Sequence, residues 1–276
     1  MIAGMRLHRA CGWLLALGWL VIPAAAASDG SMPAKVLAHR EDRNRLWTLI
    51  HDACSPAAAR NIYPPSPCAE VDTSHGNAGG YAVLKDRTGR YQYLLLPLAR
   101  IPGIESPALL APGAPNYFAD AWTARLYVEA ALHAAQSRDV LSLVVNSGHG
   151  RSQDQLHIHL DCIRPDVHDA LQRLLPTITS RWRALSERLP PHRHDYQAMW
   201  VEGETLPINP FKALADALPA SDSMASHSLI VVGAYSADGK PGFILLSGHV
   251  DPMHDDRGSG DELQDIDCGI AIRPKP

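Results

Sequence analysis

Apolar residues recur at helical spacing in three stretches of this chain. Within residues 34–59 the apolar positions stand among charged ones on a single helical face, and residues 116–136 repeat the pattern. The third stretch begins at Asp166, which is predicted to cap the N-terminus of a helix, and the pattern continues to residue 185. The sequence therefore predicts helices over residues 34–59, 116–136 and 166–185.

Runs rich in β-branched, leucine and tyrosine residues separate these helices. Two pairs of runs flank glycine-containing turns at residues 86–89 and 237–239, which predicts two hairpins. With two single strands added, the predicted strands cover residues 81–85, 91–96, 140–145, 155–162, 229–235 and 242–246. Strands mixed with helices, without regular alternation of the two, predict an α+β fold.

The two predicted hairpins resemble each other. YAVLKDRTGRYQYLLLP, which begins at Tyr81, and SLIVVGAYSADGKPGFILLS, which begins at Ser228, share strand length and turn chemistry. One interpretation is an intrachain pseudo-dimer, in which an active half (residues 28–190) faces a degenerate half (residues 191–276). Such a chain would be a monomer. The other interpretation is that any two amphipathic hairpins share this pattern.

The N-terminus has the pattern of an export signal. Arg6 and Arg9 precede an apolar run over residues 12–22, which closes on small residues at 24–26. The run is shorter than the ~20 residues that cross a bilayer, so residues 1–27 are predicted to be a cleaved signal peptide. A retained membrane anchor is the alternative. In either case residues 28–276 would lie outside the cytoplasm.

Four cysteines follow the predicted signal, in a compartment that permits oxidation. They are Cys54, Cys68, Cys162 and Cys268. Two disulfides are therefore predicted, and three pairings are open. Cys54 with Cys68 is the local candidate because the proline-rich linker between them can double back, and Cys162 with Cys268 would then form the other pair. A zinc site made by the same four is disfavoured, because the chain has no C-x-x-C pair.

The segment most informative about chemistry runs from residue 146 to 162. On a strand, alternate residues share a face, so the row Gln155, His157, His159 and Asp161 projects one way while the apolar residues between them enter a core. The glycine- and serine-rich loop at residues 147–152 precedes this row. Backbone N–H groups of such a loop can converge on an anion, so the sequence predicts a polar row beside a phosphate-binding loop.

These residue types support covalent phosphoryl chemistry. A neutral imidazole is nucleophilic near neutral pH, so His157 is predicted to attack phosphorus and form a phosphoramidate. His159 would hold non-bridging oxygens, while Ser152 and the loop amides would stabilise the developing charge. An alternative is a zinc hydrolase that uses His157, His159 and Asp161, because H-x-H-x-D opens a metal-hydrolase motif. That motif continues with histidine, where this chain has Cys162.

Composition and other polar clusters lead to further predictions. A formal net charge of −4 argues against a nucleic-acid partner, because binders of the phosphate backbone normally have a basic stripe. Lys85 is a candidate contact to a nucleotide. His194 and Tyr196, in a proline-bounded bend, are candidate phosphate contacts. The covalent scheme demands no metal or other cofactor.

The same segment resembles the histidine triad superfamily, whose signature is a G-x-S loop followed by His-x-His-x-His. Gly150-Arg151-Ser152 and then Gln155-Leu156-His157-Ile158-His159 match the spacing. The resemblance implies a histidine-triad-like antiparallel sheet with flanking helices, His157 as nucleophile, and a phosphate-holding role for His159. Gln155 departs from the signature by replacing the first, supporting histidine. Residues implied to contact phosphate are Asn146, Gly150, Arg151 and Ser152.

A wider likeness extends over nearly the whole chain after the signal. The segments PCAEVD, VLKDR, GIESP, NS, the histidine row and CIRPDV, in that order, resemble the CDP-diacylglycerol pyrophosphatase family. The resemblance implies hydrolysis of CDP-diacylglycerol to CMP and phosphatidate through a CMP-histidine intermediate. It also implies contact with a membrane surface and a place at the periplasmic face of the inner membrane, or in the periplasm. The alternative from another class is a nucleotide-diphosphate binding module that has lost turnover through Gln155.

Overall fold

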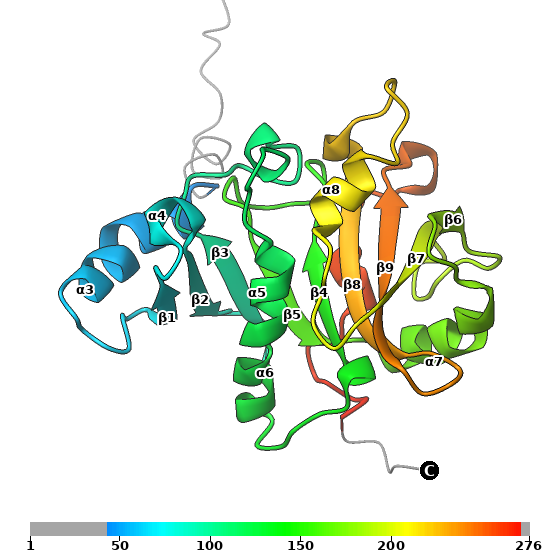
Figure 1. Ribbon diagram of the computed structural model, residues 1–276, viewed down its shortest axis with the longest axis horizontal. Coiled ribbons are helices and arrows are strands. Elements are labelled where there is room, and N and C mark those ends of the chain that lie inside the picture. Colours follow the sequence, from blue (N-terminus) through cyan, green and yellow to red (C-terminus); the bar gives the residue numbers. More distant parts are fainter. Residues whose placement is uncertain (1–42, 272–276) are drawn as a thin grey trace, which may run out of the picture.

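The computed structural model describes residues 43–271, which form one nine-stranded antiparallel sheet flanked by helices (Figure 1). The strand order across the sheet is β1-β2-β3-β5-β4-β8-β9-β7-β6, and every neighbouring pair is antiparallel. The α+β prediction is confirmed. The strands are β1 (Cys68–Asp72), β2 (Tyr81–Lys85), β3 (Tyr93–Pro97), β4 (Leu141–Val145), β5 (Ile158–Cys162), β6 (Arg183–Ala184), β7 (Tyr196–Glu202), β8 (His227–Tyr235) and β9 (Pro241–His249).

Helical segments are short and connect the strands. The α-helices are α2 (Arg45–Leu49), α3 (Ser55–Ala59), α4 (Gly76–Gly79), α5 (Tyr117–Ala124), α6 (Leu126–Ala131), α7 (Pro165–Leu174) and α8 (Pro210–Ala215). A π-helical turn, η1 (Ile50–Cys54), joins α2 to α3. The 3₁₀ turns are η2 (Pro107–Leu109), η3 (Arg138–Val140), η4 (Leu175–Thr177), η5 (Met224–Ser226), η6 (Pro252–His254) and η7 (Gly260–Leu263).

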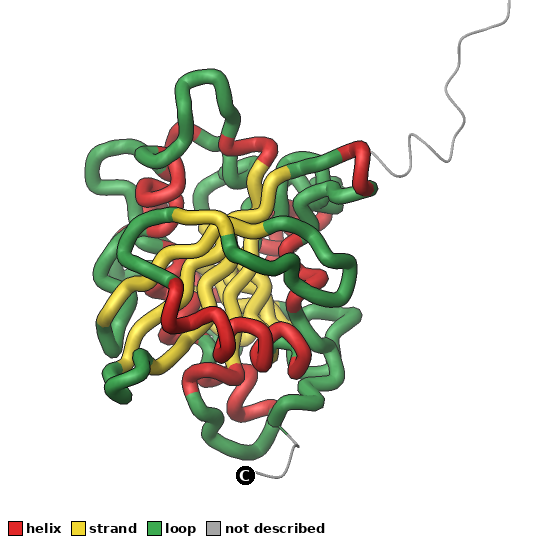
Figure 2. Tube along the Cα trace, turned by 90° about the vertical axis from the view of Figure 1, so that its right-hand side faces the viewer, coloured by secondary structure: helices red, strands yellow, loops and turns green. Residues whose placement is uncertain are grey.

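The central strands are apolar on both faces because helices cover both sides of the sheet. On β4, Leu143 and Val145 enter the core beneath α5 and α8, whereas Val144 enters the core beneath α7. Strand β8 divides in the same way, with Val231 on the first face and Ile230 on the second. Figure 1 places α5, α6 and α8 on the near face, and Figure 2 shows the strands as a single layer between helices. Continuous apolar runs are the expected pattern for strands buried on both faces.

Both predicted hairpins are present. Strands β2 and β3 pair from Tyr81 opposite Pro97 to Lys85 opposite Tyr93. Strands β8 and β9 pair over their whole length, from His227 opposite His249 to Tyr235 opposite Pro241. Runs of strand-forming residues and the glycine-containing turns between them are local signals, so they identified these hairpins without tertiary information.

Several predicted boundaries were wrong. The helix expected over 166–185 ends at Leu174, because Pro176 follows within the next turn and the chain then leaves toward β6. The helix over 116–136 is divided into α5 and α6 and ends at Ala131. The strand over 155–162 begins at Ile158, so Gln155 and His157 precede it. The predicted helix over 34–59 spans residues 45–59 among those described, and its first part lies outside them.

Three strands, β1, β6 and β7, and two short helices, α4 and α8, were not predicted. Strand β7 lies in the bend that carries His194 and Tyr196, and it pairs with β9 from Tyr196 to Glu202. Strand β1 pairs with β2 through a register shift between Cys68 and Glu70. Polar and apolar residues are mixed in β1 and β7, where buried positions alternate irregularly with half-buried or exposed ones. A single sequence therefore gives a weak periodic signal for them.

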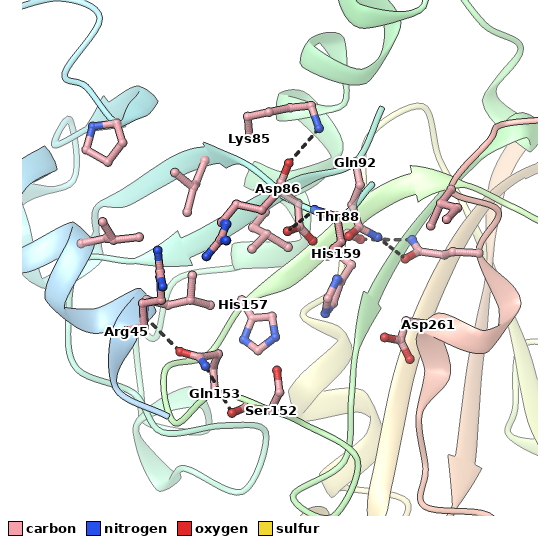
Figure 3. A pocket seen from close by; sticks show the side chains of 18 residues that line it. Arg45, Lys85, Asp86, Thr88, Gln92, Ser152, Gln153, His157, His159 and Asp261 are labelled. Carbon is pink, nitrogen blue, oxygen red and sulfur yellow. Dashed lines mark hydrogen bonds between the residues drawn. The ribbon is translucent and has the colours of Figure 1, made fainter. Parts of the chain in front are cut away.

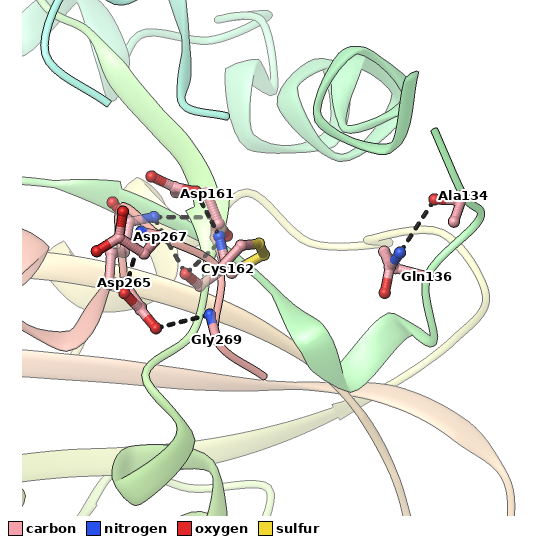
Figure 4. The surroundings of a disulfide bond; sticks show 10 residues. Ala134, Gln136, Asp161, Cys162, Asp265, Asp267 and Gly269 are labelled. Atoms are coloured by element: carbon pink, nitrogen blue, oxygen red, sulfur yellow. Dashed lines mark hydrogen bonds between the residues drawn. A yellow bond between two sulfur atoms is a disulfide. The ribbon is translucent and has the colours of Figure 1, made fainter. Parts of the chain in front are cut away.

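Both disulfides join the predicted partners. Cys54 at the end of η1 bonds Cys68 at the start of β1, with Cα atoms 5.7 Å apart. Cys162 at the end of β5 bonds Cys268 in the C-terminal segment, with Cα atoms 5.2 Å apart (Figure 4). Stable disulfides are typical of proteins outside the cytoplasm. The predicted signal peptide or anchor at residues 1–27 lies outside the described residues. No helix within residues 43–271 combines the length and apolar character needed to cross a bilayer.

Candidate active site

A pocket of about 820 Å³ opens on the face of the sheet opposite α5. Three parts of the chain form it: the N-terminal helix α2, the β2–β3 hairpin with the segment entering β5, and the C-terminal segment after β9 (Figure 3). Polar residues that line it are Arg45, Lys85, Asp86, Arg87, Thr88, Gln92, Ser152, Gln153, His157, His159, Asp261 and Gln264, and apolar ones are Leu46, Leu49, Pro67, Leu84, Leu94 and Ile266.

The alternation of β5 places both predicted histidines in this pocket. Ile158 and Leu160 are buried in the core beneath α5, so His159 between them faces the other side. His157 stands one residue before the strand, and its ring lies beside that of His159 (Figure 3), with ring centroids 4.8 Å apart. The predicted division of polar and apolar residues between the two faces is confirmed for these positions.

The ring of His157 is oriented by a backbone carbonyl. Its Nδ1 lies 2.7 Å from the carbonyl oxygen of Gln155. A carbonyl oxygen only accepts, so Nδ1 carries the proton and Nε2 has the free lone pair. Burial of the ring lowers the pKa of His157 to about 4, with the neighbouring His159 acting in the same direction. The imidazole is therefore neutral near pH 7, as a nitrogen nucleophile requires.

The ring nitrogens of His159 are buried and lack a partner among the described residues. Neither Nδ1 nor Nε2 has a hydrogen bond within the described residues, and both atoms are shielded from solvent. Burial lowers the pKa of His159. Buried polar atoms are normally satisfied, so two unsatisfied ring nitrogens facing a pocket indicate a polar ligand at this position.

Gln155 does not point its side chain at the pocket. The side chain is fully buried, and its Nε2 donates to the carbonyl oxygens of Pro97, at 2.9 Å, and Ala99, at 3.0 Å. The amide therefore anchors the segment that leaves β3. The expectation that Gln155 shares a face with His157 and His159 is corrected, and its contribution to the site is the backbone carbonyl that holds His157.

The loop before β5 does not present the expected cradle of amides. Ser147 N–H donates to the Gly258 carbonyl and Gly148 N–H to the Ala225 carbonyl. The Ser147 hydroxyl accepts from the amides of His149 and Gly150, and the Ser147 carbonyl accepts from Arg151. Amides 147–151 are thus committed within the protein, because the loop folds around its own serine and against the C-terminal segment. Sequence pattern alone could not show this.

Of the residues implied to hold phosphate, Ser152 lines the pocket and three others do not. Arg151 is ion-paired with Glu105, at 2.6 Å, and with Asp154, at 3.2 Å. Asn146 accepts the Asp261 amide at 3.2 Å through its side-chain oxygen. Gly150 is held by Ser147. Arg151 and Asn146 therefore fix the loop and the C-terminal segment around the pocket.

Two arginines that were not predicted supply positive charge at the pocket. Arg45 of α2 and Arg87 of the β2–β3 turn are both exposed and line it. Within the described residues neither has an ion-pair partner. Arg87 stands in the KDR turn, which belongs to the segments that carry the family resemblance. Arg45 precedes the histidine row by more than 100 residues, so no local sequence signal connects Arg45 with the pocket. Unpaired guanidinium groups suit phosphate oxygens.

Lys85 lines the pocket, but its ammonium group is committed to the hairpin. Nζ donates to the carbonyl oxygens of Asp86, at 3.0 Å, and Gly89. It also lies 5.4 Å from the ring centroid of Tyr93. Burial lowers the pKa of Lys85. The side chain therefore holds the turn that presents Arg87.

Comparison with known proteins agrees with this geometry. The family model described as CDP-diacylglycerol pyrophosphatase matches residues 41–272. The chain is 40% identical over 227 residues to a CDP-diacylglycerol pyrophosphatase of Yersinia pestis, which covers 82% of this chain and 84% of that protein. The chain belongs to the CDP-diacylglycerol pyrophosphatase family. The resemblance read from the sequence is thereby confirmed.

In this family member the C-terminal segment completes the pocket. Gln264 donates to the Ser142 carbonyl at 3.1 Å and to the His159 carbonyl at 3.3 Å. The disulfide between Cys162 and Cys268 ties the same segment to the end of β5 (Figure 4). Asp261 and Gln264 were not predicted site residues, because a contact across more than 100 residues leaves no trace in local pattern.

Asp161 does not join the two histidines. Its side chain is buried, one oxygen accepts the Cys162 amide at 2.8 Å, and burial raises its pKa to about 7. Among the described residues, the clusters whose ligand atoms lie within 4.8 Å of one another include neither His157 nor His159. One cluster contains Asp161 with Cys162 and Cys268, whose sulfurs are consumed by the disulfide. The geometry therefore does not support the alternative zinc site built on H-x-H-x-D.

His194 and Tyr196 lie away from the His157 pocket, and neither lines it. Nδ1 of His194 lies 2.9 Å from Glu262, and the Tyr196 hydroxyl donates to the same carboxylate at 2.8 Å. The Glu262 side chain therefore connects the bend before β7 with the 3₁₀ turn η7. Their expected contact with substrate in this pocket is corrected to a contact between two segments of the fold.

Proposed function

We propose that this chain hydrolyses CDP-diacylglycerol to CMP and phosphatidate, with Nε2 of His157 as the nucleophile. Family membership supports the substrate and the overall reaction. The observation that supports the nucleophile is the buried, neutral ring of His157, fixed by Gln155 and open to a pocket with two unpaired arginines.

The reaction would proceed in two displacements. In the first, Nε2 bonds to the phosphorus of the CMP half and the bond from that phosphorus to the phosphatidate oxygen breaks. Phosphatidate leaves as a phosphate monoester, whose second pKa is ~6, so it needs little proton donation. In the second, water attacks the CMP phosphorus, the phosphorus–nitrogen bond breaks, and the ring leaves as neutral imidazole. The water proton passes to solvent.

The pocket offers groups for each part of the diphosphate. Arg45 and Arg87 would hold non-bridging oxygens, and Ser152 would donate its hydroxyl to the group under attack. His159 would donate one ring N–H to a phosphate oxygen, which gives a partner to a nitrogen that otherwise has none. The residue in the position of the first triad histidine acts through its carbonyl, so Gln155 is compatible with turnover.

The apolar lining of the pocket suits the lipid part of this substrate. Leu46 and Leu49 of α2 and Ile266 of the C-terminal segment line the same pocket as the arginines. We infer that the chain takes its substrate from a membrane surface. The chain itself would lie at the periplasmic face of the inner membrane or in the periplasm. The two disulfides support a place outside the cytoplasm.

We also infer that the sheet is a pseudo-dimer of two histidine-triad-like halves. Counted outward from the central β4–β8 pair, the order β4-β5-β3-β2 on one side corresponds to β8-β9-β7-β6 on the other, and β1 is an additional strand at the first edge. Helices α5 and α8 hold equivalent places in the chain, because α5 lies between β3 and β4 and α8 lies between β7 and β8. The match equates the β2–β3 hairpin with β6–β7, not with β8–β9 as the sequence suggested. The halves would then divide before β6, and the chain would act as a monomer.

The second half would be degenerate in this scheme. Strand β9 takes the place of β5, and its central residues Ile244, Leu245 and Leu246 are all buried and apolar. No histidine of β9 stands at a position that corresponds to His159. One pocket per chain would therefore carry the chemistry.

The decisive experiment is to trap the intermediate. Protein is mixed with CDP-diacylglycerol labelled at the phosphorus of the CMP half and quenched with denaturant within the first turnover. We expect acid-labile label on the protein, absent from His157→Ala and retained by the control His51→Ala, whose ring is exposed and paired with Asp52. Release of CMP by His157→Ala at the wild-type rate would overturn the nucleophile. Binding of CMP without any product would identify a binding module instead.

A further inference from the structure

A second group of polar side chains lies at the ends of β8 and β9, outside the pocket described above. It consists of Asp222, His227 and His249, and one ligand atom from each lies within 4.8 Å of the others. His227 begins β8 and His249 ends β9, and the two are direct cross-strand partners. The loop before β8 brings Asp222 against both rings. None of the three lines the His157 pocket.

The distances in this group match the edges of a metal-coordination polyhedron. Asp222 Oδ2 lies 3.0 Å from His227 Nε2, and Asp222 Oδ1 lies 3.5 Å from His249 Nε2. Zinc bonds nitrogen and oxygen at about 2.0–2.1 Å, so neighbouring ligand atoms of a tetrahedron stand about 3.3 Å apart. The two rings meet edge to face, with centroids 4.8 Å apart. Small side-chain rotations would therefore converge three ligands on one ion.

Ser247 gives His227 the support that a metal ligand needs. Its hydroxyl lies 2.9 Å from Nδ1 of His227, and both side chains are buried. A hydroxyl can donate to Nδ1 while Nε2–H faces Asp222, or accept from Nδ1–H while Nε2 binds a metal. The ring can thus exchange tautomers without losing this hydrogen bond. Such outer partners orient histidine ligands in metal sites.

We propose that Asp222, His227 and His249 bind a divalent transition-metal ion of the zinc class. His227 is the buried ligand, with a side chain 3% exposed, whereas the side chain of His249 is 54% exposed. The solvent side would supply the remaining coordination position. Imidazole nitrogen with one carboxylate is a donor set that zinc accepts, and it disfavours Mg²⁺ and Ca²⁺, which prefer oxygen.

The ion would brace the loop that leads to the catalytic histidine. The turn after Asp222 accepts the Gly148 amide at the Ala225 carbonyl, at 2.8 Å, and the Val250 amide at the Ser226 carbonyl, at 2.8 Å. Gly148 begins the loop that continues through Ser152 to His157. Since the site shares no lining residue with the pocket, the ion contributes to the stability of this loop and takes no part in the phosphoryl transfer.

Metal titration of the full, untagged chain tests the proposal. After dialysis against chelator, calorimetric titration with Zn²⁺ is expected to show one tight site per chain, and excess Zn²⁺ to raise the Tm by about 4 °C or more. His249→Gln and Asp222→Asn are expected to weaken that site at least tenfold. The chain has 14 histidines, which can bind zinc weakly. His51→Gln is therefore the matched control, because it removes a histidine outside the proposed site.

Two results would overturn the proposal: no binding at micromolar Zn²⁺ in the wild type, or equal affinity in His249→Gln. His249 is exposed, so its variant is expected to fold, and circular dichroism verifies this. Hydrolysis of CDP-diacylglycerol is measured in parallel and is expected to survive in both variants. Failure of the metal site is thereby distinguishable from failure of the proposed reaction.

Discussion

Nδ1 of His157 lies 2.7 Å from the carbonyl oxygen of Gln155, two residues earlier in the chain. This contact fixes the ring tautomer, because the carbonyl can only accept. The contact would orient the proposed nucleophile in a chain that has Gln155 where the histidine triad signature has its first histidine. The backbone provides the orienting oxygen, and the Gln155 side chain holds that backbone in place through the carbonyls of Pro97 and Ala99.

Loss of the Gln155 anchor is expected to reduce both stability and turnover. Gln155→Leu would leave the carbonyls of Pro97 and Ala99 without donors, at a cost of about 1–3 kcal/mol in the free energy of unfolding. The kcat should fall because the carbonyl at position 155 is no longer fixed, while KM changes less. Urea unfolding and initial rates measure the two effects. A variant with wild-type stability and kcat would show that the anchor is dispensable.

The enzyme should lose activity only at acidic pH. Because burial lowers the pKa of His157 to about 4, the ring is protonated below that pH and has no lone pair for attack. The value of kcat/KM is therefore expected to rise through a midpoint near pH 4 and to stay level from about pH 5 to pH 7. Circular dichroism at each pH separates this titration from unfolding. A midpoint near the ordinary histidine value would contradict a buried, neutral nucleophile.

Removal of the two unpaired arginines should weaken substrate binding more than chemistry. Arg45→Gln and Arg87→Gln are each expected to raise KM up to about tenfold, because a charged hydrogen bond to a phosphate oxygen is lost. The effect should shrink at high ionic strength, which screens the remaining charges. Arg60→Gln serves as the control, since Arg60 is exposed at the end of α3 and does not line the pocket. Equal KM values in all three variants would argue against a diphosphate at this place.

Opening the second disulfide should impair the active site from a distance. The double variant Cys162→Ala, Cys268→Ala frees the segment that carries Asp261 and Gln264, and stability is expected to fall by about 2–5 kcal/mol. Turnover should fall further than the remaining folded fraction explains. Thermal unfolding and rates measured well below the Tm distinguish the two losses. The Cys54, Cys68 pair offers the comparison, since it ties η1 to β1.

Local pattern was sufficient for the hairpins and for the histidine row. Glycine turns between runs of strand-forming residues identified β2–β3 and β8–β9, and period-two alternation separated His159 from Ile158 and Leu160. Local pattern failed where one residue serves a distant contact. The amides of the 147–152 loop were predicted to be free to bind an anion. The loop instead folds against Ala225 and Gly258, and no residue near the loop in the sequence indicates that contact.

The sequence by itself determined the family and the way in which His159 faces on its strand, because motif spacing and alternation are properties of a few neighbouring residues. Tertiary structure alone decided what surrounds them. It brought Arg45, Arg87 and Gln264 to one pocket, separated Asp161 and His194 from it, and turned the Gln155 side chain away while keeping its carbonyl on His157. Those outcomes depend on packing between segments far apart in the chain.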